Sequence, residues 1–448
     1  MAGNGDHGRL GLGGEGGCVN LRRVTAVGAA ARPNDAYAHA SASAAFAATA
    51  CRVACGGAHT AYIDAEGALW TFGMESSLGR KGGPVPARVP LPAAAVAVSA
   101  GHHHTLVVLD DGSLWAFGDN SEGQLGVGAA ARDRAATPRP VEALGGERVV
   151  SVAAGGSHSL AATATGAVFA FGARRDGALG LGSPPGALRG LAARFLGARV
   201  AEDAQRYPAH VPGTGAGQPE ASDGVQFCAA AVYAGHNHSA ARTSRGAVYT
   251  WGRGRDYQLG HGEARGAQSS GRPRRIAQPE DGSGGAMGPI VGLALGSYHT
   301  LLVGGGGALF AAGSNEHGCL GTGDKPGWAH GAPARCAESD DNGGALRVVG
   351  ASAGWKHSAT VDDQGRLFTW GWGGSSGATD AFYSSGGQLA RGSDRDRWEA
   401  REVKLGDDEH RRDHPRALAV SCGFNHTAVI VAGREAALVA LDDAPSVV

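Results

Sequence analysis

The sequence lacks an excess of charge of either sign. Its 40 Lys and Arg residues oppose 41 Asp and Glu residues, which leaves a net charge of −1. Only four of the basic residues are lysines. Proteins that bind nucleic acid or anionic membranes through their overall field carry a clear positive excess. We therefore expect no direct sequence-specific binding to nucleic acid and no binding to membranes.

Paired cysteines and long apolar runs are also missing. No segment reaches the roughly 18 apolar residues of a membrane-spanning helix, and the first residues lack the apolar core of a signal peptide. The cysteines are odd in number and form no C-x-x-C pair, which argues against a disulfide framework and a zinc site. We expect a cytoplasmic protein, with the nucleus as an open alternative, and no metal or cofactor. The seven cysteines are Cys18, Cys51, Cys55, Cys228, Cys319, Cys336 and Cys422.

Motifs for phosphate binding and metalloprotease chemistry are absent. The chain contains neither G-x-x-x-x-G-K-[ST] nor H-E-x-x-H. Residues 407–414 place two histidines beside carboxylates and could bind a metal if they were helical, but we interpret them as a solvated loop. We assign no catalytic residue on this evidence.

Glycine is present in large excess. It accounts for 77 of 448 residues, while 42% of the chain is hydrophobic. Glycine permits positive φ angles, so this excess indicates many tight turns, and the apolar content is enough for a core. We expect a folded, β-rich protein.

A short motif repeats along the whole chain. The pattern G-x-x-H followed by Ser or Thr occurs seven times, and consecutive histidines are 45 to 80 residues apart. Such self-similarity is the signature of a repeat architecture, in which variable spacing reflects loop insertions. The seven histidines are His59, His104, His158, His238, His299, His357 and His426.

Each of the first six motifs is followed by the pattern of a β-hairpin. In residues 104–118, HTLVVLDDGSLWAFG, an apolar run leads through Asp111-Gly112 into a second run whose aromatic residues are two apart. A Gly-Leu-Gly element and a segment rich in Pro and Arg follow, and proline suits an outer edge strand. The repeat predicts an all-β, seven-bladed propeller of four-stranded antiparallel blades.

The two ends of the chain contain complementary halves of a repeat. Residues 8–13 contain a Gly-Leu-Gly element, and residues 19–24 read as an edge strand, whereas the last G-x-x-H motif has no such element after it. Strands from the two termini should therefore share one blade and close the ring. We expect a single domain over residues 1–448, with repeats at about 4–431 and loop insertions at about 27–50, 183–226, 377–386 and 393–416.

These elements, in this order, resemble the repeat of the regulator of chromosome condensation family. The resemblance implies a seven-bladed β-propeller, and the founding activity of that family is guanine nucleotide exchange on the GTPase Ran. The sequence is also similar to the plant ultraviolet-B photoreceptor branch, through GWKHS at residues 354–358 and WGWGGSSG at residues 370–377. The photoreceptors use a cluster of tryptophans in successive turns, whereas here Trp355 stands alone among the G-x-x-H turns.

We interpret the seven histidines as structural. A buried imidazole can bond a backbone carbonyl, so we expect each histidine to brace its own blade. The two variable positions inside each turn are then the natural place for function, because the frame around them is fixed. The candidate binding residues are His102, His103, His236, Asn237, Tyr298, Trp355, Lys356, Phe424 and Asn425.

Three functions are open. The first choice is a non-catalytic platform that binds a protein partner through these aromatic and imidazole side chains. The alternative is a guanine nucleotide exchange factor for a Ran-like GTPase, although none of the 14 variable turn positions is acidic. The third is a photoreceptor-like signalling protein. We expect no enzyme, and if the chain is active, the resemblance implies an exchange factor rather than a hydrolase or a transferase.

Overall fold

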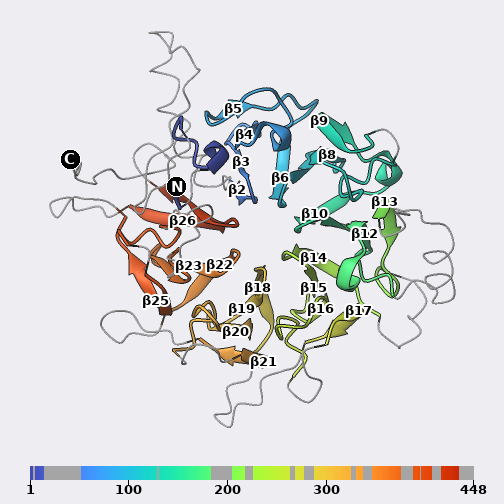
Figure 1. The fold of residues 1–448 in the computed structure, drawn as a ribbon. Helices are drawn as coiled ribbons and strands as arrows, with labels where there is room; N and C mark the ends of the chain where they lie inside the picture. The colour runs from blue at the N-terminus through green and yellow to red at the C-terminus, as the bar shows by residue number, and fades with distance from the viewer. Residues whose placement is uncertain are drawn as a thin grey trace, which may run out of the picture.

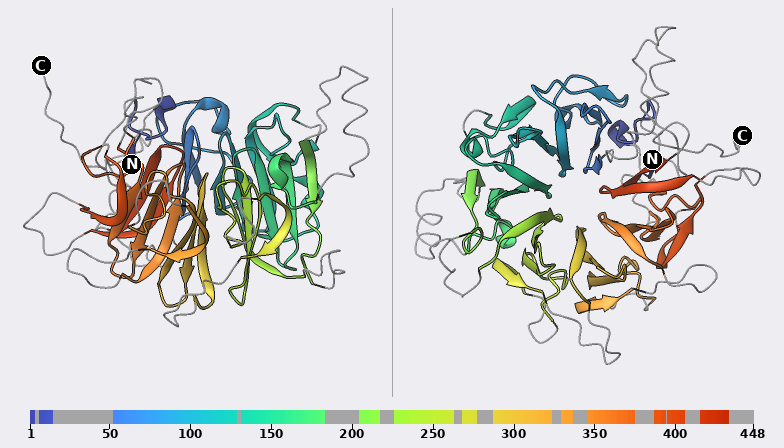
Figure 2. Two further views of the ribbon diagram at one scale, coloured as in Figure 1. Left: turned by 60° about the horizontal axis from the view of Figure 1, so that its bottom comes forward. Right: turned by 180° about the vertical axis from the view of Figure 1, so that it is seen from behind.

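The computed structural model is a β-propeller. Its sheets are arranged around a central axis, with β2, β6, β10, β14, β18, β22 and β26 innermost (Figure 1). Seen from the side and from behind, the strands run roughly along this axis and form a thick disc (Figure 2). The structure describes residues 1–3, 6–14, 52–128, 131–182, 204–216, 226–262, 268–276, 287–323, 329–336, 346–374, 387–393, 395–405 and 415–432.

Blades 1 to 6 are four-stranded antiparallel sheets, numbered along the chain. Blades 1 to 3 contain β2 (Arg52–Cys55), β3 (His59–Ile63), β4 (Leu69–Gly73) and β5 (Ala87–Arg88); β6 (Ala95–Ala100), β7 (His104–Leu109), β8 (Leu114–Asp119) and β9 (Arg134–Pro140); and β10 (Val149–Ala154), β11 (His158–Thr163), β12 (Val168–Ala173) and β13 (Ala204–His210).

The next three blades repeat this order. They contain β14 (Ala229–Ala234), β15 (His238–Thr243), β16 (Val248–Gly252) and β17 (Ser270–Arg275); β18 (Ile290–Leu295), β19 (His299–Gly304), β20 (Leu309–Ser314) and β21 (Ala329–Arg335); and β22 (Val348–Ala353), β23 (His357–Asp362), β24 (Leu367–Gly371) and β25 (Arg397–Val403).

The seventh sheet joins the two ends of the chain and is called the closing blade below. It has three described strands, β26 (Arg416–Cys422), β27 (His426–Ala432) and β1 (Ala2–Gly3), in the order β1-β27-β26. The structure thus confirms an all-β propeller of four-stranded antiparallel blades and corrects the number of complete blades from seven to six. The edge strand expected at residues 19–24 lies outside the described residues.

Short 3₁₀ helices occur in the loops: η1 (Asp6–Gly8), η3 (Glu75–Ser77), η5 (Glu142–Leu144) and η6 (Arg175–Gly177). Two of the expected insertions contain an outer strand, since β13 falls within 183–226 and β25 within 393–416. Part of each of these two insertions therefore forms a strand of a blade. The expected insertions at 27–50 and 377–386 lie outside the described residues.

The core lies between neighbouring blades. The aromatic side chain of a third strand packs against the leucine of the preceding blade's Gly-Leu-Gly element, as Phe171 does on Leu125 and Trp370 on Leu320. All four side chains are fully buried. The aromatic strand and the Gly-Leu-Gly element are thus the two halves of each contact between blades.

Candidate interaction face

The seven histidines of the G-x-x-H turns are buried and link neighbouring blades. In every case, Nε2 lies within hydrogen-bond distance of the Ser or Thr hydroxyl that follows the histidine of the next blade. The pairs and their N···O distances are His59–Thr105 2.7 Å, His104–Ser159 2.9 Å, His158–Ser239 2.9 Å, His238–Thr300 2.9 Å, His299–Ser358 2.8 Å, His357–Thr427 3.1 Å and His426–Thr60 3.0 Å, which closes the circle.

The hydroxyl in these pairs fixes the tautomer of the histidine. Ser159, for example, donates its proton to the carbonyl of Gln124, at 2.6 Å, so it can only accept from His104 Nε2–H. The same geometry recurs at Thr300, which donates to the carbonyl of Gln258 at 2.7 Å. The Gly-Leu-Gly element and the histidine of one blade therefore hold the same hydroxyl of the next.

Burial keeps these histidines neutral. Removing an imidazole from water penalises its charged form. Neighbouring histidines add to this effect at most of the positions. Burial lowers the pKa of the histidines from 6.5 to about 3 for His59, His104, His238 and His357, to about 4 for His158 and His299, and well below 6.5 for His426.

The expected hydrogen bond of each histidine to a carbonyl of its own blade is therefore wrong. The partner belongs to the next blade, because the turn aims the imidazole across the interface. The first glycine of the turn allows this approach: a Cβ at Gly101 would lie 2.3 Å from the His104 ring and 2.5 Å from the carbonyl oxygen of Gly155 in the next blade. No side chain fits there.

The first variable position of each turn points to the mouth of the central channel. A hollow of about 100 Å³ opens there, and His102, His236, Trp355 and Phe424 line it. Trp355 and Phe424 stack with their ring centroids 4.4 Å apart and their planes 9° apart. His102 lies 5.2 Å from Phe424 and 5.8 Å from His236. We call these four residues the channel-mouth cluster.

The imidazoles of the channel-mouth cluster are uncharged near neutral pH. Burial, followed by the neighbouring His103 and His236, lowers the pKa of His102 to about 4. Burial, together with Arg253, also lowers the pKa of His236. All four side chains remain partly exposed. The cluster is therefore a neutral, aromatic surface that solvent can reach.

Among the candidate binding residues at the second variable position, Asn425 differs from the others. The His103 ring is 4.2 Å from that of His102, and Tyr298 lies beneath the guanidinium of Arg253, 5.8 Å from its carbon. The backbone carbonyl of Asn237 accepts a bond from the Arg253 amide, at 2.9 Å. Asn425 is only 6% exposed and belongs to the interior rather than to the face.

Lys356 connects the cluster to residues that the sequence did not single out. Its ammonium lies 4.7 Å from the Trp355 ring centroid and 5.6 Å from that of Trp372, just after β24. Nζ is 3.0 Å from Nε2 of His317, whose Nδ1 is 3.3 Å from Oδ2 of Asp396. A cation held over two indole rings is favourable.

Trp372 corrects the expectation of a lone tryptophan. Its ring meets that of Trp355 edge to face, with centroids 5.4 Å apart. Arg9 was also missed: it is 6% exposed, and its Nη1 donates to the carbonyl of Gly57, at 2.8 Å. Trp372 stands two residues beyond the Trp370 of the aromatic strand, and this spacing could have indicated it. No local signal indicated Arg9.

The family comparison covers nearly the whole chain. The RCC1-like domain matches residues 1–429. The chain belongs to the RCC1-like domain family. Among curated members, it is 29% identical over 294 residues to the ultraviolet-B receptor UVR8 of Arabidopsis thaliana, covering 66% of this chain and 53% of the receptor. It is 31% identical to the X-linked retinitis pigmentosa GTPase regulator homolog of Caenorhabditis elegans, covering 60% of this chain and 20% of that protein. The chain thus spans about half of UVR8 and a smaller part of the other relative.

Solved RCC1-like propellers share this architecture. Prp20p of Saccharomyces cerevisiae, studied for its binding to Gsp1p and histones, superposes with a TM-score of 0.70 and 21% identity, over 99% of this chain and 91% of that one. Human WBSCR16 gives a TM-score of 0.65 and 22% identity, over 86% and 88%. At this identity, the superposition shows the fold alone.

The described part of this RCC1-like domain contains neither a metal-binding cluster nor a membrane-spanning helix. None of its His, Cys, Asp and Glu residues gather in threes at a spacing suited to a metal ion. No helix among the described residues is long and apolar enough to cross a membrane.

Proposed function

We propose that this RCC1-like domain is a non-catalytic platform that binds a protein partner through the channel-mouth cluster. The observation that carries the proposal is the stacked Trp355–Phe424 pair, with centroids 4.4 Å apart at the channel mouth, partly exposed and next to neutral imidazoles. Aromatic side chains in partly desolvated pockets supply most of the energy of typical protein interfaces. The rigid frame beneath them lowers the entropy cost of binding.

Affinity capture on the immobilised full chain tests this proposal. The wild type should retain a reproducible set of proteins that the Trp355→Ala and Phe424→Ala variants both lose, because each change removes half of the stack. Tyr207→Ala serves as the matched control, since Tyr207 is an aromatic residue 54% exposed on the outer strand β13. Equal retention by all four proteins, with unfolding curves unchanged, would contradict the proposal.

A response to ultraviolet-B light is a second candidate, supported by one observation. Trp355 has a second indole, Trp372, 5.4 Å away, and the Lys356 ammonium over both rings. A light response would change the oligomeric state or the tryptophan fluorescence under ultraviolet-B illumination. Trp372→Phe, which breaks the indole pair and keeps an aromatic ring, should then abolish the change. A wild type that shows no change under illumination would remove this candidate.

Nucleotide exchange on a Ran-like GTPase is the remaining alternative. The likeness of fold to Prp20p supports it, whereas the absence of acidic residues from the variable turn positions counts against it. Release of a fluorescent guanine nucleotide from Ran, measured with substoichiometric full-length protein, decides the matter. We expect no acceleration; catalytic release would make the chain an exchange factor that uses other loops.

A further inference from the structure

Arginines gather on one sector of the face that carries the channel-mouth cluster. Two come from the loop after β12, two from the loop after β16, and one from the outer strand β17. The aspartates described in the same loops are Asp176 and Asp256. Because the whole chain has a net charge of −1, this is a local excess. The members of this arginine sector are Arg174, Arg175, Arg253, Arg255 and Arg272.

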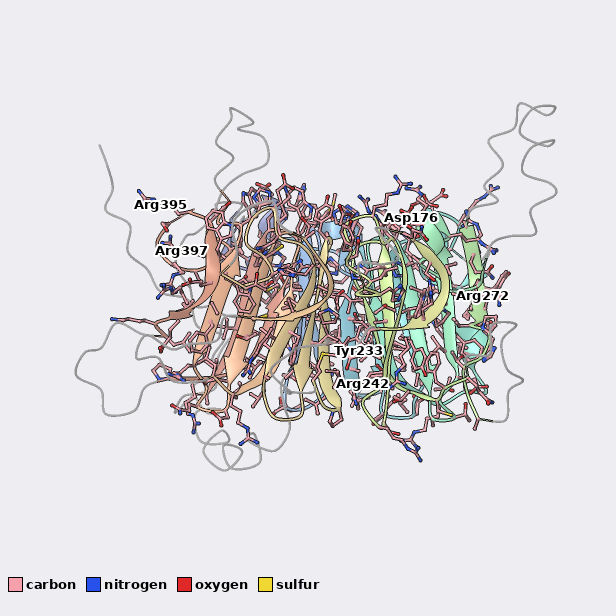
Figure 3. All side chains as sticks on the ribbon, turned by 90° about the horizontal axis from the view of Figure 1, so that it is seen from below. Asp176, Tyr233, Arg242, Arg272, Arg395 and Arg397 are labelled. Atoms are coloured by element: carbon pink, nitrogen blue, oxygen red, sulfur yellow. The ribbon has the colours of Figure 1, made fainter. Side chains whose placement is uncertain are left out.

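Contacts between blades 3 and 4 bring these arginines together. The helix η6, which contains Arg175, contacts β16 and β17. The Gly182 amide donates to the carbonyl of Gly271, at 2.8 Å, so the loop of blade 3 lies directly on the outer strand of blade 4. Figure 3 shows Asp176 near one face of the disc and Arg272 on its outer side, while Arg242 lies toward the opposite face.

Only part of this positive charge is neutralised. Arg253 pairs with Asp256, with 3.1 Å between Nη2 and Oδ2, and Arg175 pairs with Glu122 of blade 2. Arg174 and Arg255 form no ion pair with any other described residue, and Arg255 is exposed. A guanidinium offers a planar fork of donors that matches a carboxylate. The guanidinium groups of Arg174 and Arg255 therefore face solvent in this sector.

The sector is continuous with the channel-mouth cluster. Arg253 lies over Tyr298, and its charge acts on His236, which in turn is 6.2 Å from Phe424. A partner anchored on Phe424 would thus extend over Arg253 toward Arg255 and Arg174. Its surface there would meet guanidinium groups rather than apolar rings.

We propose that the arginine sector binds an acidic, Asp- and Glu-rich segment of the protein partner. This inference rests on the proposed function, since it specifies the charge of the partner surface that would lie on the face carrying the channel-mouth cluster. A peptide is favoured over nucleic acid because the positive charge is confined to one sector beside uncharged rings, whereas a phosphodiester chain needs an extended basic track. Complementary charge of this kind mainly raises the association rate and selects the partner.

A labelled acidic peptide tests the inference without knowledge of the partner. The full chain is titrated at low salt against a short fluorescein-labelled peptide of alternating Asp and Glu, followed by fluorescence anisotropy. The double variant Arg174→Glu, Arg255→Glu should bind roughly tenfold more weakly or worse, and wild-type binding should weaken with added salt. The double variant Arg88→Glu, Arg139→Glu is the matched control, because it makes the same change of charge at exposed positions on β5 and β9.

The outcomes separate this inference from the proposed function. Equal loss of peptide binding in both double variants, or no wild-type binding at low salt, would overturn the arginine sector. Binding of an oligonucleotide in preference to the peptide would overturn the choice of an acidic protein segment. If Arg174→Glu, Arg255→Glu loses the peptide while Trp355→Ala retains the captured proteins, the sector stands and the channel-mouth cluster fails. The reverse pattern would leave the cluster and remove the sector.

Discussion

The six complete blades and the closing blade differ in the number of residue pairs that join their neighbouring strands. In each complete blade, the second and third strands share five residue pairs, as His104–Val108 do with Leu114–Gly118. In the closing blade, β27 and β1 share two, Ala2 with Thr427 and Gly3 with His426. Among the described residues, the closing blade thus has fewer strand pairs than any other blade.

The histidine–hydroxyl hydrogen bonds between neighbouring blades are also formed at the seam. The hydrogen bonds from His357 to Thr427 and from His426 to Thr60 are present there too, at 3.1 and 3.0 Å, slightly longer than the 2.7 to 2.9 Å of the other five. Thr60 also donates to the carbonyl of Arg9, at 2.8 Å, and Arg9 in Gly8-Arg9-Leu10-Gly11 has the position that Gln124 has in its own Gly-Leu-Gly element. The described part of the seam is therefore closed both by side-chain hydrogen bonds between blades and by the pairing of β1 with β27.

The largest effect is expected from removing the closing blade. A chain that ends after Ala417 lacks β27 and most of β26, so blades 1 and 6 each lose a neighbour and the ring of hydrogen bonds is opened twice. We expect loss of the cooperative unfolding transition, measured by circular dichroism during heating. A chain that ends after Ala432 keeps every described strand and is the control. A folded, cooperative product from the shorter chain would contradict the closure.

Acid should weaken all the links between blades together. Burial lowers the pKa of six of these histidines to about 3 to 4 in the folded chain and that of His426 well below its ordinary value, whereas an imidazole in the unfolded chain has a pKa of about 6.5. Their contribution is complete above pH 6.5 and is lost progressively below it, by about 1.4 kcal/mol per pH unit for each histidine that binds a proton only when unfolded. Urea unfolding at a series of pH values between neutral and mildly acidic conditions measures this. A flat stability profile across that window would show that the imidazoles are not buried as described.

Removing a single hydroxyl by a Thr→Val substitution allows the seam to be compared with the rest of the ring. Thr300→Val leaves His238 Nε2–H and the Gln258 carbonyl without their partner, at about 1–3 kcal/mol for each buried group. Thr60→Val leaves His426 Nε2–H and the Arg9 carbonyl without their partner in the same way, so we expect a similar cost at the seam.

Urea titration of each variant gives its free energy of unfolding, and the two costs can then be compared. Thr137→Val, at an exposed position on β9, should change it little and is the control. A smaller cost for Thr60→Val than for Thr300→Val would mean that strand pairing, rather than the hydroxyl, closes the ring.

The sequence was enough to predict the strands that recur in every repeat. It was not enough to predict contacts between two blades. The spacing of residues such as Trp115 and Phe117 predicted the strands because the period of two is local. The partner of each histidine could not be predicted, since His426 and Thr60 are 366 residues apart and the choice depends on how the turns face each other. For the same reason, the position of Trp372 against Trp355 emerged only from the packing.

The smallest predicted effect concerns a compensating pair at the seam. In most of the complete blades, the last residue of the Gly-Leu-Gly element lies against the next blade's aromatic side chain; a Cβ at Gly126 would be 2.9 Å from Phe171. At the seam, this position is Ala390, with φ of 55°, and the residue in the aromatic position is Ala2, in the same buried cluster. The small Ala2 leaves space for the Ala390 methyl group.

Ala390→Gly should therefore be nearly neutral or stabilise the chain by up to about 1 kcal/mol. It relieves a left-handed backbone that costs an alanine about 1–2 kcal/mol, while it loses one buried methyl group and frees the unfolded chain. Gly126→Ala, the same exchange in reverse, should destabilise the chain because both the strained φ and the contact with Phe171 oppose it. Urea midpoints of the two variants measure the contrast, and equal destabilisation would show that the buried Ala390 methyl group contributes more than its left-handed backbone costs.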